Sequence, residues 1–212
     1  MITKDHKDFV IAENINYVAY GKEQKDNQLN NKKSIDETDY KYRYELTRPY
    51  GPGNKLLCFI MFNPSTSSSE DSDNTTKRCF TIAKNWGYDG IALYNIYAVR
   101  SENKRAVEKQ IMTNDKRAIA EMVGNKNEEV LNHVIKCKQY DKIVCAWGNH
   151  PHSKDFDTRV LNILKNISID KLRILGISAK RQPNHPLGVS TEITEERSAL
   201  LAIQYIEGIA KK

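Results

Sequence analysis

An amide side chain stands where an apolar stretch of the chain meets a polar loop. Asn63 follows the continuous apolar run Leu56 to Phe62 and precedes Pro64. An amide can bind and orient a water molecule, but it cannot take up a proton at neutral pH. Asn and Pro are also common turn residues, so the alternative is that Asn63 only shapes the turn. If the site is catalytic, we expect Asn63 to position water rather than to deprotonate it.

The loop that follows offers carboxylates as candidates for the missing base. Asp71 and Asp73 are the two acids that we consider for activating a water molecule. An acidic residue just before a helix is also a frequent N-cap, whose side chain accepts a hydrogen bond from a backbone N–H group. Asp73 or Asn74 as the cap of a helix is therefore the competing interpretation.

Two further polar residues are candidates for contacting a ligand. His185 lies in a loop next to the rigid Pro186, where it could donate a hydrogen bond to a ligand oxygen and stabilise negative charge there. A surface histidine without a role is the alternative. Asn95 interrupts an apolar strand, and burying its amide costs about 1 to 3 kcal/mol unless its hydrogen bonds are met. Backbone groups could meet them, and so could the edge of a nucleobase.

Basic residues flank three of the loops and suggest a partner with phosphate groups. A rim of such residues would contact phosphates, although exposed positions on a solvated surface would give the same pattern. The candidates are Lys77, Arg78, Arg100, Lys104, Lys180 and Arg181.

The elements that must position these residues follow from the hydrophobic pattern. Buried apolar strands alternate with segments of helical period, which predicts an α/β fold with three layers (α/β/α). We expect a central, mainly parallel, four-stranded sheet and an antiparallel edge strand, because Tyr40, Tyr42, Tyr44 and Leu46 alternate with polar residues. The expected parallel strands are 56–62, 91–99, 142–146 and 172–175, and the expected helices are about 74–86, 126–137, 156–166 and 192–210.

The candidate residues all lie near the carboxyl ends of the expected parallel strands. Ligands of such sheets bind at that edge. Residues 63–66, 100–103, 147–150 and 176–178 follow the four strands directly, and the last of these leads on to His185. Segments far apart in the sequence should therefore meet in one site.

Composition sets the wider limits. The chain has 212 residues and a net charge of +6, which fits one α/β/α domain over residues 39–212 after a polar N-terminal extension at residues 1–38. The longest apolar run is much shorter than the roughly 20 residues of a membrane helix. No secretory leader is evident at the N-terminus, so we expect the protein in the cytoplasm, without contact to a membrane. We also expect it to be a monomer. The four cysteines lack metal-binding spacing, and we expect no metal and no cofactor.

Several motifs of the chain resemble those of known families. Asn63-Pro64-Ser65-Thr66, Ala146-Trp147-Gly148 and His185-Pro186-Leu187 are similar to motifs of a conserved bacterial and phage domain family of unknown function, over about residues 40–190. The order of the motifs and their placement after strands also resemble, more distantly, the uracil-DNA glycosylase superfamily.

The second resemblance implies an activity and assigns roles to residues. It implies a glycosylase that turns a base out of DNA and cleaves its N-glycosidic bond. Asn63 would orient water, alone or together with Asp71 or Asp73, and His185 would stabilise the departing base. The residues implied to contact that base are Phe62, Ser65, Asn95, Tyr97 and Trp147.

Departures from the superfamily's pattern leave the substrate open. Ser65 stands where the uracil-specific branch has a bulky Tyr, so the resemblance implies room for a modified base, such as a C5-substituted pyrimidine. We expect a role in repair or in defence against modified DNA. Leu187-Gly188 replaces the usual residues of the last motif and puts the role of this loop in DNA intercalation in question. A free nucleoside or nucleotide as substrate, or a non-catalytic module that binds modified nucleic acid, are the alternatives.

Overall fold

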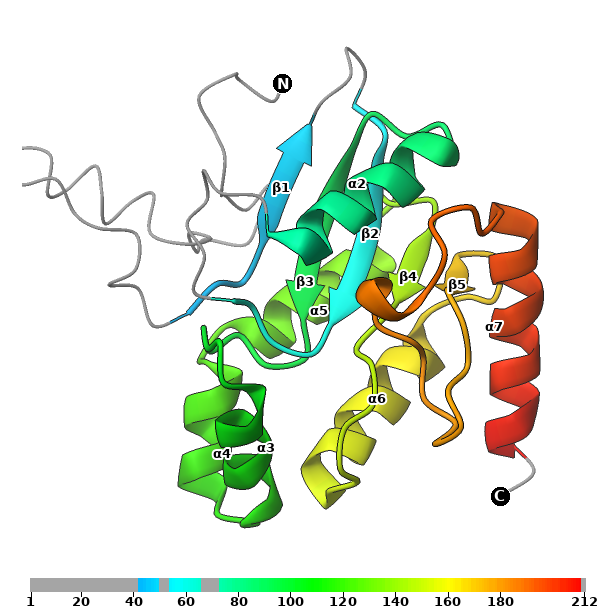
Figure 1. The fold of residues 1–212 in the computed structure, drawn as a ribbon. Helices are drawn as coiled ribbons and strands as arrows, with labels where there is room; N and C mark the ends of the chain where they lie inside the picture. The colour runs from blue at the N-terminus through cyan, green and yellow to red at the C-terminus, as the bar shows by residue number, and fades with distance from the viewer. Residues whose placement is uncertain (1–41, 50–53, 66–72, 211–212) are drawn as a thin grey trace, which may run out of the picture.

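The central sheet contains five strands and is mixed (Figure 1). The computed structural model describes residues 42–49, 54–65 and 73–210. The sheet has the order β1-β3-β2-β4-β5, in which β1 pairs with β3 antiparallel and all other pairs are parallel. The expected four-stranded sheet is therefore corrected to five strands, because the edge strand belongs to the same sheet. The strands are β1 (Leu46–Pro49), β2 (Leu56–Met61), β3 (Gly90–Asn95), β4 (Ile143–Cys145) and β5 (Leu172–Ile174).

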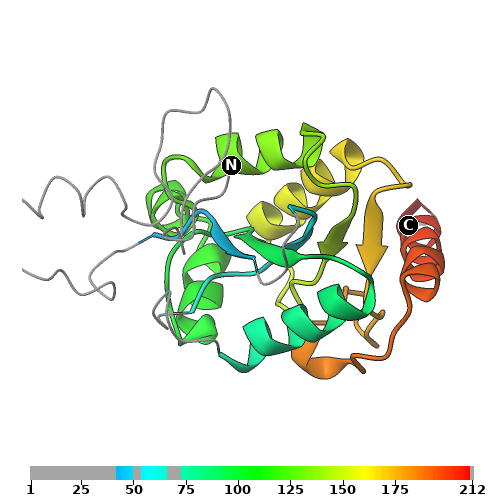
Figure 2. The ribbon, with the colours of Figure 1, turned by 90° about the horizontal axis from the view of Figure 1, so that it is seen from above.

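Helices cover both faces of the sheet, as the continuous apolar strands predict (Figure 2). One face is covered by α2, the other by α5 and α6, and α7 packs beside β5 at the sheet's edge. The protruding pair α3 and α4 lies beyond the carboxyl ends of the strands (Figure 1). The helices are α2 (Asn74–Asn85), α3 (Lys104–Met112), α4 (Lys116–Val123), α5 (Asn127–Lys136), α6 (Lys154–Asn166), α7 (Glu195–Ala210) and the short 3-10 helix η3 (Pro186–Gly188).

The strand β2 supplies both halves of the core. Its residues are all buried and alternate between two hydrophobic clusters. Leu56, Cys58 and Ile60 pack in the cluster that includes residues of α5 and α6, whereas Leu57 and Phe59 pack in the cluster of α2. Burial of one such side chain stabilises the fold by about 1.5 to 3 kcal/mol. This buried strand fixes where the polar residue after it, Asn63, must lie.

The helices α3 and α4 were not predicted. Each buries little of its surface, because α3 has only Val107 and Ile111 buried and α4 only Val123. A short helix with so few buried positions has almost no hydrophobic period for a sequence pattern to detect. The four predicted helices are found at α2, α5, α6 and α7, with their ends shifted by up to three residues.

The edge of the sheet differs from the predicted pattern. The strand β1 begins at Leu46, and Tyr42 makes only an isolated bridge to Val99. Arg43 and Glu45 were expected to face solvent but are buried. Within residues 42–46, the part of this segment that the structure describes, the predicted alternation is therefore wrong as a description of exposure. The predicted extension at residues 1–38 lies outside the described residues.

The strand β3 is shorter than predicted and ends at Asn95 instead of Val99. At its end the Asn127 side chain donates hydrogen bonds to the backbone oxygens of Asn95 and Ile96, at 3.0 and 2.8 Å. A side chain thus satisfies the carbonyl groups that a neighbouring strand would have paired if β3 had continued. The chain then turns at the edge of the sheet where ligands of parallel sheets bind.

No helix within the described ranges is both long enough and apolar enough to span a bilayer.

Candidate functional site

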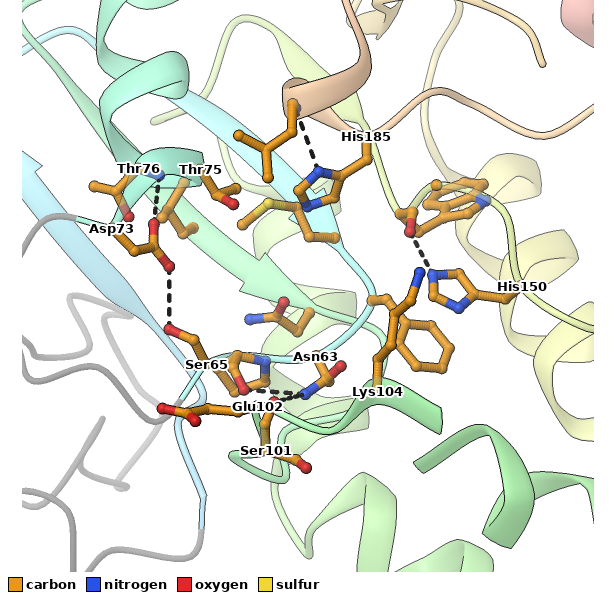
Figure 3. Close-up of a pocket in the computed structure, with 18 of the residues that line it drawn as sticks. Asn63, Ser65, Asp73, Thr75, Thr76, Ser101, Glu102, Lys104, His150 and His185 are labelled. Atoms are coloured by element: carbon orange, nitrogen blue, oxygen red, sulfur yellow. Dashed lines mark hydrogen bonds between the residues drawn. The ribbon is translucent and has the colours of Figure 1, made fainter. Parts of the chain in front are cut away.

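A cavity of about 600 Å³ opens at the carboxyl ends of β2, β3 and β4 (Figure 3). This is the edge where the sequence predicts a site. Residues from seven separate stretches of the chain line it, within 43–46, 61–65, 73–76, 93–95, 101–104, 147–150 and 184–188. The predicted residues that the structure brings together there are Phe62, Asn63, Ser65, Asp73, Asn95, Lys104, Trp147 and His185.

The amide of Asn63 is held in one orientation. Its Nδ2 group donates to the backbone oxygens of Pro64 and Ser101, at 3.0 and 2.9 Å. Because both bonds need the nitrogen as donor, they also fix which amide atom is the oxygen. Oδ1 is left as an acceptor, and an acceptor can orient a water molecule through its O–H group.

Asp73 is held by the start of α2. One carboxylate oxygen accepts the backbone N–H of Thr76 at 2.7 Å, as the N-cap of the helix, and the other accepts the Ser65 hydroxyl at 3.1 Å. The N-cap interpretation of Asp73 is thus confirmed. Both oxygens of this carboxylate are therefore engaged by the protein itself. Asp71 lies outside the described residues.

Two buried polar groups at the cavity lack partners. Asn95 and Trp147 both line the cavity, and each is almost completely buried, at 3% and 1% exposure. Asn95 Oδ1 and Trp147 Nε1 have no hydrogen-bond partner among the described residues. A buried acceptor or donor without a partner costs about 1 to 3 kcal/mol. These are groups that a bound ligand or an ordered water would satisfy.

The imidazole of His185 is neutral and has a defined tautomer. Its Nδ1 accepts the backbone N–H of Leu187 at 3.3 Å, so the ring proton is on Nε2. Burial, together with the nearby His150 and Lys104, lowers the pKa of His185 to about 4. The ring faces the cavity (Figure 3). Among the described residues, none accepts a hydrogen bond from Nε2. At neutral pH His185 is therefore an uncharged donor.

The backbone that carries these rings is fixed by close packing. Gly148 has φ of 81°, and a Cβ atom there would lie 3.1 Å from the Cβ of His185. Glycine both adopts this left-handed conformation and leaves room for His185. Its N–H group donates to the oxygen of Pro183 at 3.0 Å, and the Gln182 amide pairs with the N–H and the C=O of His150. The loops after β4 and β5 thus form one unit.

His150 is a residue of the site that the sequence analysis did not single out. Its ring stacks on Phe62, with centroids 3.5 Å apart, and its nitrogens lie 2.7 Å from Glu108 Oε1 and 2.6 Å from the oxygen of Trp147. Burial lowers the pKa of His150, and the bond to Glu108 opposes this. Its position just after a strand's end was the only signal in the sequence. Thr75 and Thr76, which also line the cavity, gave none.

Other predicted residues lie elsewhere. Tyr97 is fully buried, and its hydroxyl donates to Asp155 at 2.9 Å. Arg78 donates to the backbone oxygens of Pro186 and Val189, and the buried Arg100 has Nε 3.4 Å from the oxygen of Ser65. Among the predicted phosphate-binding residues only Lys104 lines the cavity, while Lys77, Arg78, Arg100, Lys180 and Arg181 do not.

No group of three or more His, Cys, Asp or Glu side chains in ranges 42–49, 54–65 and 73–210 could hold a metal ion. The four cysteines are free thiols, of which Cys58, Cys79 and Cys145 are buried in the core.

Comparison with known proteins gives a family. A family model described as "Protein of unknown function (DUF1643)" matches residues 43–187. Those residues extend from the segment before β1 to the loop of His185, so they include every described residue assigned to the cavity except Gly188. Comparisons with curated proteins and with solved structures found no match.

Proposed function

The chain belongs to the DUF1643 family, and from that premise we propose that it is a DNA glycosylase that hydrolyses the N-glycosidic bond of an unusual base. The substrate base lies in the cavity, turned out of its stack. The bond between C1′ and the base nitrogen breaks, and its electron pair leaves with the base. The oxygen of a water molecule then bonds to C1′, and the proton that this water loses ends on the departing base or in solvent.

The observation that carries this proposal is that His185 and Asn63 line the same cavity, one as a hydrogen-bond donor and the other as an acceptor. Negative charge develops on the base as it departs, and a fixed donor stabilises it. His185 Nε2–H is such a donor, since its neutral state lets it donate without adding a charge that would hold an anion too tightly. Asn63 Oδ1 is the acceptor that orients the attacking water.

The contacts of Asp73 and Asn63 agree with this chemistry. Asp73 is engaged through both oxygens, and Asn63 does not accept a proton. An oxocarbenium-like sugar reacts with water that is only weakly activated. The residues therefore suit a reaction in which loss of the base leads and attack by water follows.

The buried polar groups support a base as the ligand. A nucleobase presents C=O and N–H groups along a flat edge, which would satisfy Trp147 Nε1 and the Asn95 amide. Ser65 is small, and its hydroxyl is turned to Asp73, which leaves space for a substituent on the base. The similarity in motif order to the uracil-DNA glycosylase superfamily supports the same reading.

A second candidate function is hydrolysis of a free nucleoside or nucleotide. It is favoured because two of the residues predicted to contact phosphates, Arg78 and Arg100, instead donate hydrogen bonds to backbone oxygens of the protein. Lys104, which lines the cavity, could contact one phosphate group there. A non-catalytic module that binds modified nucleic acid would use the same cavity without turnover.

Single-turnover assays on a panel of oligonucleotides test the proposal. The panel contains unmodified bases, uracil and pyrimidines with C5 substituents of increasing size, and each strand is examined for abasic sites; matched nucleosides and nucleotides are examined for free base. We expect abasic sites with at least one modified base, and their loss in His185→Ala. The exposed Leu200→Gln on α7 is the control. Binding of the panel without release of any base would overturn the enzyme proposal.

A further inference from the structure

A second hollow lies beside the cavity, between the α3–α4 pair and the start of α6. Its volume is about 720 Å³. The α3–α4 pair and the start of α6, which border it, extend beyond the carboxyl edge of the sheet (Figure 1). The residues that line it are Met112, Asn114, Lys116, Ile119, His152, Ser153, Lys154, Asp155 and Thr158.

Two segments of the chain run from the cavity to this hollow. Lys104 at the start of α3 lines the cavity, Glu108 bonds His150, and Met112 at the end of α3 lines the hollow. Their spacing of four residues puts the three side chains on one face of the helix. On the opposite side, residues 147–150 line the cavity and residues 152–155 line the hollow. The cavity and the hollow are therefore parts of one path along α3.

The charge along this path is positive and unneutralised. Lys109, Lys116 and Lys154 are exposed, and none has an ion pair or side-chain hydrogen bond among the described residues. Arg105 and Arg117 on the same two helices are also exposed and unpaired within those residues.

The acids beside the path are already engaged. Asp155 accepts from Tyr97 and Arg159, Asp157 pairs with His152, and Asp115 caps α4. Glu108 is held by His150. What remains available to a ligand is therefore mainly lysine and arginine.

We propose that the strand whose base enters the cavity continues along α3 into the second hollow. Its phosphates contact Lys116 and Lys154, which line the hollow, and Lys109, an exposed residue of α3 one turn before Met112. This rests on the proposed function and selects, within it, a nucleic-acid strand over a free nucleotide. Met112, which is 51% exposed, and Ile119 provide apolar surface on which a neighbouring base packs. The α3–α4 pair thus takes the role that the sequence assigned to Arg78 and Arg100.

The test compares two triple variants that remove the same charge. One is Lys109→Gln, Lys116→Gln and Lys154→Gln on the path. The matched control is Lys84→Gln, Lys136→Gln and Lys165→Gln, three exposed lysines in the last turns of α2, α5 and α6, at the opposite edge of the sheet. Thermal melting establishes that each variant is folded. Binding of a fluorescein-labelled 15-nucleotide single strand is measured by anisotropy over a range of salt concentrations.

We expect the path variant alone to change the salt dependence. Each phosphate contact contributes about 0.7 to the slope of log K against log salt for single strands, so three lost contacts reduce the slope by about 2. The affinity at low salt should fall about tenfold or more, while the control variant stays close to the unmodified protein. Equal changes of the salt dependence in both triple variants, or no change in either, would contradict the proposed course of the strand along α3.

The readout also separates this inference from the proposed function. Binding that depends on the path without release of a base supports the path and overturns the glycosylase. Release of base from a mononucleotide by a protein that does not bind the strand supports hydrolysis and overturns the path.

Discussion

The two walls of the cavity are built in different ways. On the wall formed by the loop after β2 and the start of α2, the polar side chains are bonded to the protein itself. Asn63 donates to two carbonyl groups, and Ser65 and Asp73 bond to each other. On the wall formed by the loops after β4 and β5, the backbone is bonded instead. The donors of Trp147 and His185 on this wall have no acceptor within the part of the chain that the structure describes.

This difference indicates which wall meets the ligand. A wall whose side chains are satisfied internally can hold a small acceptor, such as Asn63 Oδ1, in a fixed place. A wall with a fixed backbone and unsatisfied donors presents those donors at no cost of reorganisation when a ligand arrives. We infer that the first wall positions the water and that the second binds the base.

The largest effect on the rate is expected from removing His185, on the second wall. His185→Ala takes away the neutral donor that faces the base, so the single-turnover rate should fall about 10²- to 10³-fold. Stability should change little, because the side chain makes one hydrogen bond, to Leu187. The rate of abasic-site formation measures the first effect and thermal melting the second. A variant that keeps more than half of the original rate would show that the second wall is not the catalytic one.

A smaller effect is expected from loosening the second wall without touching the cavity. Arg78 on α2 donates to the backbone oxygens of Pro186, the first residue of η3, and of Val189, which follows η3, and so positions the loop of His185. Arg78→Met leaves both oxygens unsatisfied and should cost about 2 kcal/mol of stability. The rate should fall on the order of tenfold, since a displacement of about 1 Å at a reacting group can cost up to 10²-fold.

Partial recovery in the conservative variant distinguishes positioning from phosphate binding. Arg78→Lys retains a donor that can reach one of the two oxygens, so it should recover part of the rate and of the stability. The salt dependence of binding to DNA should be unchanged in both variants. A change in that salt dependence with unaltered stability would instead place Arg78 at a phosphate.

The fold could be predicted from sequence where burial dictated the pattern. Leu56 to Met61 is buried on both faces, so its residues had to be apolar without interruption. By contrast, Arg43 and Glu45 are charged but buried at the edge of the sheet, and no periodicity reveals such an exception. The helices α3 and α4 bury too few residues to leave a hydrophobic period.

The sequence predicted those site residues that lie at the ends of strands, because the strand ends themselves could be predicted. Asn63, Asn95 and Trp147 follow or end the apolar runs, and the parallel arrangement brings them to one edge. The role of Arg78 depends on α2 packing against η3, more than a hundred residues later in the chain. His150 owes its place to Glu108 and Phe62, which meet it only through tertiary packing. Contacts of this kind leave no mark in local sequence.

The first wall can be tested by changing one atom of Asn63. Asn63→Asp replaces the donating nitrogen with an oxygen that would face the oxygens of Pro64 and Ser101. The two hydrogen bonds that the amide donates are lost, and a carboxylate oxygen then faces the partially negative carbonyl oxygens. The free energy of unfolding should therefore fall by about 1 to 3 kcal/mol, as measured by urea denaturation. Asn63→Ala, which only removes the bonds, should cost less. Equal stability of Asn63→Asp and the unmodified protein would show that the amide is not fixed as described.

The last prediction concerns pH, and it tests whether His185 is neutral. The pKa of His185 is about 4 in the folded protein and about 6.5 in an ordinary unfolded chain. Between these values the unfolded state binds more protons, so this contribution to stability is complete above pH 6.5 and is lost as the pH falls to about 4. The slope from one such group is at most about 1.4 kcal/mol per pH unit. His185→Asn keeps an acceptor for the Leu187 N–H group but does not titrate, whereas His150 titrates in both proteins. Urea denaturation at intervals from pH 7 to pH 4 should therefore show a shallower decline for His185→Asn. Parallel declines would mean that His185 is not buried as a neutral ring, and the second wall would then present a cation to the base.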